Sequence, residues 1–142
     1  MTLICNFTRL KIIKKCFPRM PINYEMQHQN GILHVRAYGE DSGLEEVINY
    51  QKAIHKMASD LSIRKVFCDE IDLKYNIGLK DTYKLAEMIS KAEVGELIIA
   101  IVTRDINYIE ATFFELLINS NTVRIKFFPT ATAGKMWLDA QP

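Results

Sequence analysis

The chain has 142 residues, of which 49% are hydrophobic and 25% are charged, and its formal net charge at pH 7 is +1. This length and composition are typical of one folded domain and exclude an intrinsically disordered chain. The near-neutral charge gives no global attraction to nucleic acid. The longest apolar run, Leu97–Val102, is far shorter than the roughly 20 residues that a membrane-spanning helix needs.

The first 19 residues differ from the rest of the chain because they carry five basic residues and no acid. An export signal is disfavoured, since the charges follow the apolar residues and no small-residue cleavage site is present. We interpret residues 1–19 as a basic, peripheral N-terminal extension and residues 20–142 as one domain. An ordered local addition and a membrane- or partner-binding arm are the alternatives. Three cysteines at spacings that match no zinc or redox pattern favour a reducing, cytoplasmic compartment.

An antiparallel hairpin is predicted at the start of the domain. Polar and apolar residues alternate over residues 24–29 and 32–38, and Asn30-Gly31 between them favours a type I′ turn, because both residues tolerate positive φ. Apolar residues at three- and four-residue spacing then predict a helix over about 43–61, with Glu45 and Glu46 in its first turn. The segment Lys65–Glu70 is predicted to be a short third strand.

The rest of the chain alternates helices and strands. A second helix is predicted to begin near Asp81, and Leu97–Val102 has the unbroken apolar run of a strand buried on both faces at the centre of a sheet. A third helix over residues 108–120, a last strand over 123–128 and a final helix from Thr130 complete the order. The side chains predicted to face inward on the second and third helices are Leu79, Tyr83, Leu85, Ala86, Ile89, Ile109, Phe113, Leu116 and Leu117. Phe114 is assigned to an exposed patch or a homodimer contact.

This order predicts an α/β fold with a small mixed, largely parallel sheet of about five strands, opened by a β-hairpin and covered by about four helices. Strands that alternate with helices imply right-handed crossovers and parallel neighbours. No internal repeat or low-complexity tract interrupts the pattern.

Three segments resemble the SpoIIAA-like branch of the STAS domains, the sulfate-transporter and anti-sigma-factor-antagonist family. They are KVFCDEIDLKYNIGLKDTYKLAEM, LIIAIVTRDINYIEATFFELL and VRIKFFPTATAGKMWL, within a match that spans roughly residues 20–140. The resemblance implies a cytoplasmic, non-enzymatic regulatory or protein-interaction module. In bacterial antagonist members, a serine that follows an aspartate at the start of the helix after the third strand is phosphorylated. Here only Asp81-Thr82 is similar, several residues after Gly78.

The resemblance places a partner-binding surface, or a phosphorylation site, on the loop and helix start around residues 72–84. A phosphate at a helix start is stabilised by exposed amides and by the helix dipole, while plain N-capping by Asp81 is the alternative. The residues assigned to this surface are Asp72, Asn76, Gly78, Asp81, Thr82 and Tyr83.

A ligand site is the competing hypothesis. Asp69, Glu70 and Asp72 lie at the end of the third strand, where clustered carboxylates could hold a cation or act as an acid/base pair. Arg104 follows the central strand, and ligands of open α/β sheets bind at this carboxyl edge. A pocket lined by Asp69, Asp72 and Arg104 would make the chain a small-molecule or lipid-binding domain or a weak enzyme. The simpler interpretation is a solvated loop with a surface ion pair, in which one acid caps the next helix.

No catalytic residue, metal site or cofactor is assigned. His28, His34 and His55 are spread over two strands and a helix, and only His28 and His34 are expected to lie close, across the hairpin, with no third ligand. Cys68 is expected to be a packed thiol. Neither a phosphate-binding loop, a dinucleotide-binding loop nor a nucleophile elbow occurs in the sequence.

Overall fold

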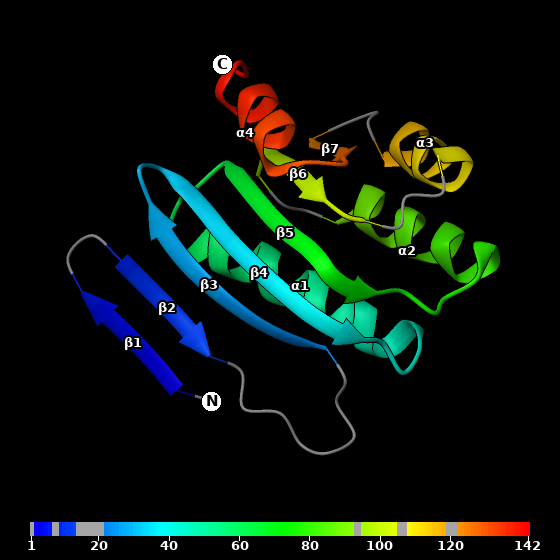
Figure 1. The fold of residues 1–142 in the computed structure, drawn as a ribbon, viewed down its shortest axis with the longest axis horizontal. Helices are drawn as coiled ribbons and strands as arrows, with labels where there is room; N and C mark the ends of the chain where they lie inside the picture. Colours follow the sequence, from blue (N-terminus) through cyan, green and yellow to red (C-terminus); the bar gives the residue numbers. More distant parts are fainter. Residues whose placement is uncertain (1, 7–8, 14–21, 93–94, 105–107, 119–121) are drawn as a thin grey trace.

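The computed structural model describes residues 2–6, 9–13, 22–92, 95–104, 108–118 and 122–142, and it forms one sheet covered by helices (Figure 1). The seven strands of the sheet lie side by side in sequence order. The first three are β1 (Thr2–Asn6), β2 (Arg9–Ile13) and β3 (Asn23–Gln29), and they pair antiparallel. The predicted sheet corresponds to β3 and the four strands after it, and β1 and β2 extend it beyond β3.

The predicted hairpin is formed by β3 and β4 (Ile32–Glu40), which pair antiparallel with Gln29 opposite Ile32. Asn30 and Gly31 occupy the turn with φ of 53° and 74°, the left-handed conformation that the Asn-Gly pair tolerates. The remaining strands are β5 (Lys65–Lys74), β6 (Leu97–Val102) and β7 (Val123–Phe128), and each pairs in parallel with the strand before it. The predicted hairpin followed by parallel strands is therefore confirmed.

Three helices cross over between the parallel strands. They are α1 (Leu44–Asp60), α2 (Leu79–Lys91) and α3 (Tyr108–Ile118). Successive right-handed crossovers between neighbouring strands place all three helices on the same face of the sheet. Residues of these helices and one face of the strands form the larger core, which includes Val47, Ile54, Ile89 and Ile99.

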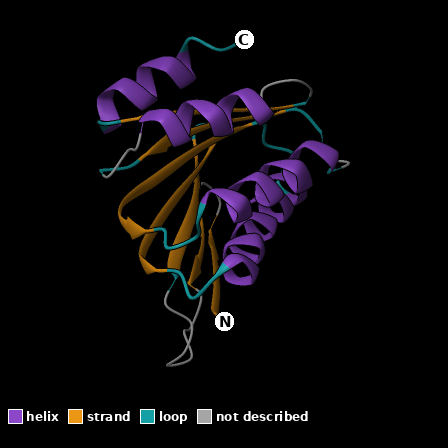
Figure 2. Ribbon diagram, turned by 90° about the vertical axis from the view of Figure 1, so that its right-hand side faces the viewer, coloured by secondary structure: helices purple, strands orange, loops and turns teal. Residues whose placement is uncertain are grey.

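The last helix, α4 (Ala131–Asp139), covers the opposite face of the sheet at β5, β6 and β7. Its N-cap is Thr130, whose side chain accepts a hydrogen bond from the backbone N–H of Ala133 at 3.2 Å. Leu138 packs there with Phe67, Val102 and Phe128 in a second, smaller core. Figure 2 shows helices packed against the twisted sheet and the C-terminus beyond α4. No helix among the described residues has the length and apolar character to cross a bilayer.

The strand β6 lies between β5 and β7, and all six of its residues are buried. Its side chains alternate between the two cores, because Ile99 and Ile101 belong to the larger one and Ile98, Ala100 and Val102 to the smaller one. The prediction of a strand buried on both faces is confirmed, but β6 is the next-to-last strand of the sheet and not its centre.

Five predicted side-chain orientations on α2 and α3 are wrong. On α2, Leu85, Ala86 and Ile89 are buried as predicted, but Leu79 and Tyr83 are exposed. On α3, Phe114 is buried, while Phe113 and Leu116, which were predicted to face inward, are exposed. Ile109 was also predicted to face inward, but its side chain is not among those that the structure describes. The cause is the same on both helices: spacing identifies residues that share a side, but the neighbouring elements decide how much of that side is covered.

Candidate functional site

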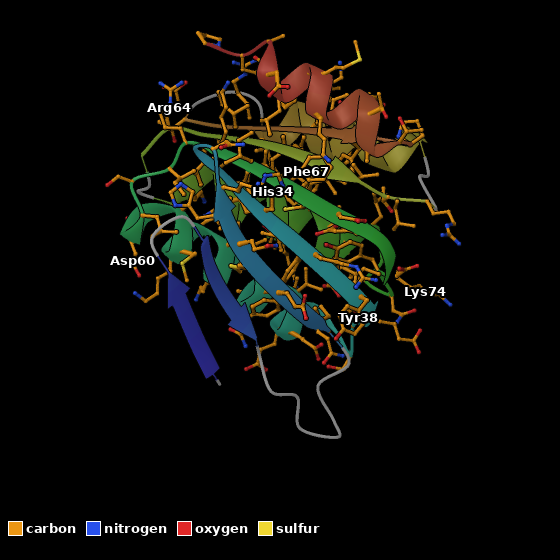
Figure 3. All side chains as sticks on the ribbon, turned by 60° about the vertical axis from the view of Figure 1, so that its left-hand side comes forward. His34, Tyr38, Asp60, Arg64, Phe67 and Lys74 are labelled. Carbon is orange, nitrogen blue, oxygen red and sulfur yellow. The ribbon has the colours of Figure 1, made fainter. Side chains whose placement is uncertain are left out.

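The carboxyl ends of β4 and β5 meet at one edge of the sheet, where the loops to α1 and α2 begin. Figure 3 shows Tyr38 and Lys74 at this edge and His34 and Phe67 further along the same two strands. The register shifts between Arg36 and Tyr38, so that Arg36 lies opposite Asp69 and Tyr38 lies opposite Asp72. This irregularity sets which side chains of β5 reach each face near the edge.

The two loops are joined by hydrogen bonds between Asn76 and Asp41. The Asn76 backbone N–H donates to Asp41 Oδ2, and its side-chain Nδ2 donates to the Asp41 carbonyl oxygen at 3.0 Å. Asp41 itself donates its backbone N–H to the carbonyl of Lys74 at 3.3 Å. The other carboxylate oxygen of Asp41, Oδ1, is buried and has no hydrogen-bond partner among the described residues. Asn76 therefore fixes the loop that precedes α2.

The predicted cluster of Asp69, Glu70 and Asp72 does not form, because β5 is longer than predicted and continues to Lys74. Side chains alternate along a strand, and Glu70 lies in the larger core while Asp69 lies on the opposite face. The Asp69 Oδ1 atom accepts a hydrogen bond from the backbone N–H of Ile71 at 3.2 Å. The prediction that one of these acids caps the next helix is also wrong, since the N-cap of α2 is Gly78.

Asp72 lies between two arginines on the surface. Its Oδ2 is 3.5 Å from Arg36 Nη2, and its Oδ1 is 3.9 Å from Arg104 Nη2. More than half of each of the three side chains is exposed, and ion pairs of this kind stabilise a fold by at most about 1 kcal/mol. The structure thus brings together Asp72 and Arg104, two of the three residues predicted to line a ligand pocket, as a surface ion pair.

Behind this surface, Glu70 is fully buried and accepts hydrogen bonds from two tyrosines. The Tyr50 hydroxyl, from α1, donates to Glu70 Oε2 at 2.6 Å, and the Tyr75 hydroxyl, from the segment after β5, donates to Oε1 at 2.9 Å. Both carboxyl oxygens are therefore satisfied in the core. The cluster connects α1, β5 and the loop that leads to α2.

Burial raises the pKa values of the groups in this cluster. Removal from water raises the pKa of Glu70 to about 7, against the hydrogen bonds from Tyr50 and Tyr75, which favour the charged form. Burial, and next the charge of Glu70, raise the pKa values of both tyrosine hydroxyls. Burial also raises the pKa of the Cys68 thiol, so this cysteine is a neutral, packed side chain as expected.

The residues predicted at the start of α2 lie on its first turns. Thr82 donates its hydroxyl to the Gly78 carbonyl at 2.9 Å, and Asp81 is the acid of the first turn. Capping of α2 by Asp81 is not observed, because the N-cap Gly78 has no side-chain hydrogen bond. Tyr83 is 49% exposed and Leu79, four residues before it, is 55% exposed. The helix start therefore presents two large apolar side chains to solvent.

The histidines do not converge. His34 lies opposite Gln27 and His28 opposite Leu33, so the two imidazoles leave opposite faces of the hairpin. Burial, and next the charge of Lys135, lower the pKa of His34, and burial lowers that of His55. Among the residues that the structure describes, no three His, Cys, Asp or Glu side chains are grouped so as to hold a metal ion.

Sequence reasoning missed the Glu70 cluster, although one signal was present. Val66, Cys68 and Glu70 alternate on β5, which puts Glu70 on the same face as two apolar residues. Tyr50 likewise falls within the apolar stripe of α1 between Val47 and Ile54. The involvement of Tyr75 could not be inferred, since it depends on the path of the chain after β5.

The geometry defines an α/β protein with a mixed sheet that a hairpin opens, a buried glutamate that accepts hydrogen bonds from two tyrosines, and an exposed helix start. Compared with known proteins, the chain matches no family model, no curated protein and no solved structure.

Proposed function

We propose that this protein is a non-enzymatic regulatory module of the SpoIIAA-like, STAS type, and that it binds a protein partner through the surface formed by residues 72–84. The supporting observation is the exposure of Leu79 and Tyr83 on neighbouring turns of α2. Complete burial of a large apolar side chain contributes roughly 1.5–3 kcal/mol, and a partner that covers the exposed half of both side chains gains part of that free energy from each. Contiguous exposed apolar residues typically mark interaction sites.

The loop before α2 supports the same proposal because it is held in place. Asn76 ties it to Asp41, and Tyr75 ties it to the buried Glu70. A surface that is already ordered loses little conformational entropy when a partner binds. Thr82 lies within this surface, and a phosphate there would add negative charge beside Tyr83, in the first turns of the helix.

The proposal is tested by capture from a cell extract with the full chain and with the double variant Leu79→Ala, Tyr83→Ala. We expect at least a tenfold loss of a specific partner, because truncated apolar anchors at a binding centre typically cost more than about 1.4 kcal/mol. The matched control is Met136→Ala, which removes an exposed apolar side chain from α4. Thr82→Asp is expected to alter the same capture. Equal recovery of every protein by all four chains would contradict the proposal.

A small-molecule or lipid-binding domain, or a weak enzyme, with a site at the carboxyl edge is the second candidate. The observation that favours it is the buried Oδ1 of Asp41, which could accept a hydrogen bond from a ligand at this edge. Asp69 lies on β5, and Arg104 lies just after the end of the neighbouring strand β6. A thermal-shift screen of small polar ligands against the full chain and Asp41→Asn tests this function. Ligands that stabilise both chains equally would exclude Asp41 from the site.

A further inference from the structure

Among the described side chains of α2 and α3, four large apolar ones are exposed. Leu79 and Tyr83 lie on α2, and Phe113 and Leu116, with exposed fractions of 38% and 74%, lie on α3. We call these four residues the α2–α3 stripe. The surface proposed above contains only the α2 pair, so the α3 pair needs a separate explanation.

Leu79, Tyr83 and Phe113 lie along the seam between the helices, and Leu116 lies beside it on the exposed side of α3. The hydroxyl of Ser90, on α2, donates to the carbonyl oxygen of Leu117, on α3, at 3.1 Å, so the side of α2 that carries Ser90 meets α3. Residues seven and eleven positions apart share a side of a helix, which places Tyr83 and Leu79 on that side as well. On α3, Phe113 precedes Leu117 by one turn. Figure 1 shows α2 and α3 as neighbours.

Two exposed lysines lie beside the stripe, and among the described residues Asp81, in the first turn of α2, is the acid nearest to them in sequence. Lys80 and Lys84 are exposed and directly follow Leu79 and Tyr83 on α2. The acid further along this face, Glu87, is already paired with Lys91, with 2.6 Å between Oε1 and Nζ. On α3, Glu115 Oε1 accepts the backbone N–H of Phe127 at 2.9 Å and so points to β7. A partner that covers the stripe therefore meets two lysines.

We propose that the α2–α3 stripe binds an amphipathic helix of the partner protein, whose apolar face is flanked by acidic residues. A seam between two helices with apolar side chains on successive turns matches the anchors that a docked helix presents at i, i+4 and i+7. Acidic flanks complement Lys80 and Lys84 and speed association. A symmetric pair of these chains would instead bring the lysines of both copies to the same interface. This inference rests on the proposed function and specifies the partner's chemistry.

Site-specific photo-crosslinking in the full chain tests the inference. A photoreactive side chain at position 116 is expected to crosslink the partner that is lost with Leu79→Ala, Tyr83→Ala, and the crosslinked segment should be an acidic amphipathic helix. The same group at position 136, on α4, is the control and should give no such product. Crosslinking of a basic or extended segment at position 116 would overturn the inference.

A matched charge pair separates the acidic flank from simple apolar contact. Leu116→Glu and Leu116→Lys both remove an apolar anchor, but only glutamate repels an acidic helix. We expect Leu116→Glu to weaken capture at least tenfold more than Leu116→Lys, and we expect added salt to reduce the difference. If Leu116→Glu and Leu116→Lys capture the partner equally while Leu79→Ala, Tyr83→Ala loses it, this inference fails and the proposed function stands. If that double variant also keeps the partner, both fail.

The same variants also test two other occupants of the α2–α3 stripe, a membrane surface and a second copy of the chain. Sedimentation of the wild-type chain, but not of Leu116→Glu, with vesicles of anionic phospholipid would assign the stripe to a membrane surface. A concentration-dependent dimer that Leu116→Glu abolishes would assign it to a second copy. Either result would overturn the inference of an acidic partner helix.

Discussion

The protonation of Glu70 depends directly on the fold. In the unfolded chain its carboxyl group titrates near the ordinary value of 4.5, whereas in the core its pKa is raised to about 7, mainly by burial. Between these two values the native state keeps a proton that the unfolded state has lost. The contribution of Glu70 to stability is therefore greatest below pH 4.5, falls as the pH rises toward about 7, and changes no further above it.

This dependence predicts the behaviour of Glu70→Gln. The variant keeps a hydrogen-bonding side chain of similar size near Tyr50 and Tyr75 but cannot ionise. Relative to wild type, its free energy of unfolding should rise by about 3 kcal/mol between pH 4.5 and pH 8, because one pKa unit corresponds to about 1.4 kcal/mol. Urea unfolding at several pH values measures this difference. Glu40→Gln, at an exposed carboxylate, is the control, and an unchanged pH slope in Glu70→Gln would contradict the prediction.

At the scale of elements, the packing of α4 on the sheet depends on Gly134. A Cβ atom built there would lie 3.2 Å from Phe67 Cε2, 3.2 Å from Val102 Cγ2 and 3.4 Å from Phe128 Cδ2. Two of these contacts are tighter than ordinary van der Waals contact, so α4 approaches β5 and β6 as closely as the absence of a side chain allows.

We predict that Gly134→Leu lowers the free energy of unfolding by about 1–3 kcal/mol, because the larger side chain overpacks the smaller core and outweighs the gain in helix propensity. Met136→Leu places leucine two residues away at a position that is 68% exposed, and it should change the stability by less than about 0.5 kcal/mol. Chemical denaturation of the two variants measures the difference. Equal stability of both would show that α4 moves away from the sheet without cost.

The exposure of the α2–α3 stripe also belongs to this scale. The four-residue spacing of Leu79 and Tyr83 correctly indicates that they share one side of α2. The buried side of that helix is nevertheless centred on Leu85, Ala86 and Ile89. Leu79 and Tyr83 therefore fall at its margin. Periodicity identifies a common side, but the width of the covered part depends on the neighbouring helix and on the sheet.

At the scale of the whole molecule, β6 joins the two cores because its side chains alternate between them. Ile99 is 1% exposed and faces the larger core, while the only tryptophan, Trp137, lies beside the smaller one, with its ring centroid 5.6 Å from that of Phe128. A substitution that destabilises one core should therefore also destabilise the other.

We predict that Ile99→Ala costs about 2–5 kcal/mol and shifts the unfolding of both cores together. Tryptophan fluorescence follows the smaller core, and far-ultraviolet circular dichroism follows the helices of the larger one. The two midpoints should move by the same amount, as expected for a cooperative single domain. A fluorescence transition that stays in place while the dichroism transition moves would show that the cores unfold separately.

The sequence by itself determined the local structure and its order: the Asn30-Gly31 turn, the buried strand Leu97–Val102, and the alternation of strands and helices that makes the later strands parallel. These features follow from φ preferences and from hydrophobic periodicity, both of which act over a few neighbouring residues. Only the tertiary structure decided which side chains leave water. The burial of Glu70 with Tyr50 and Tyr75, the pairing of Asp72 with Arg104, and the exposure of the α2–α3 stripe each depend on segments that are far apart in the chain, and their relative positions are set by packing.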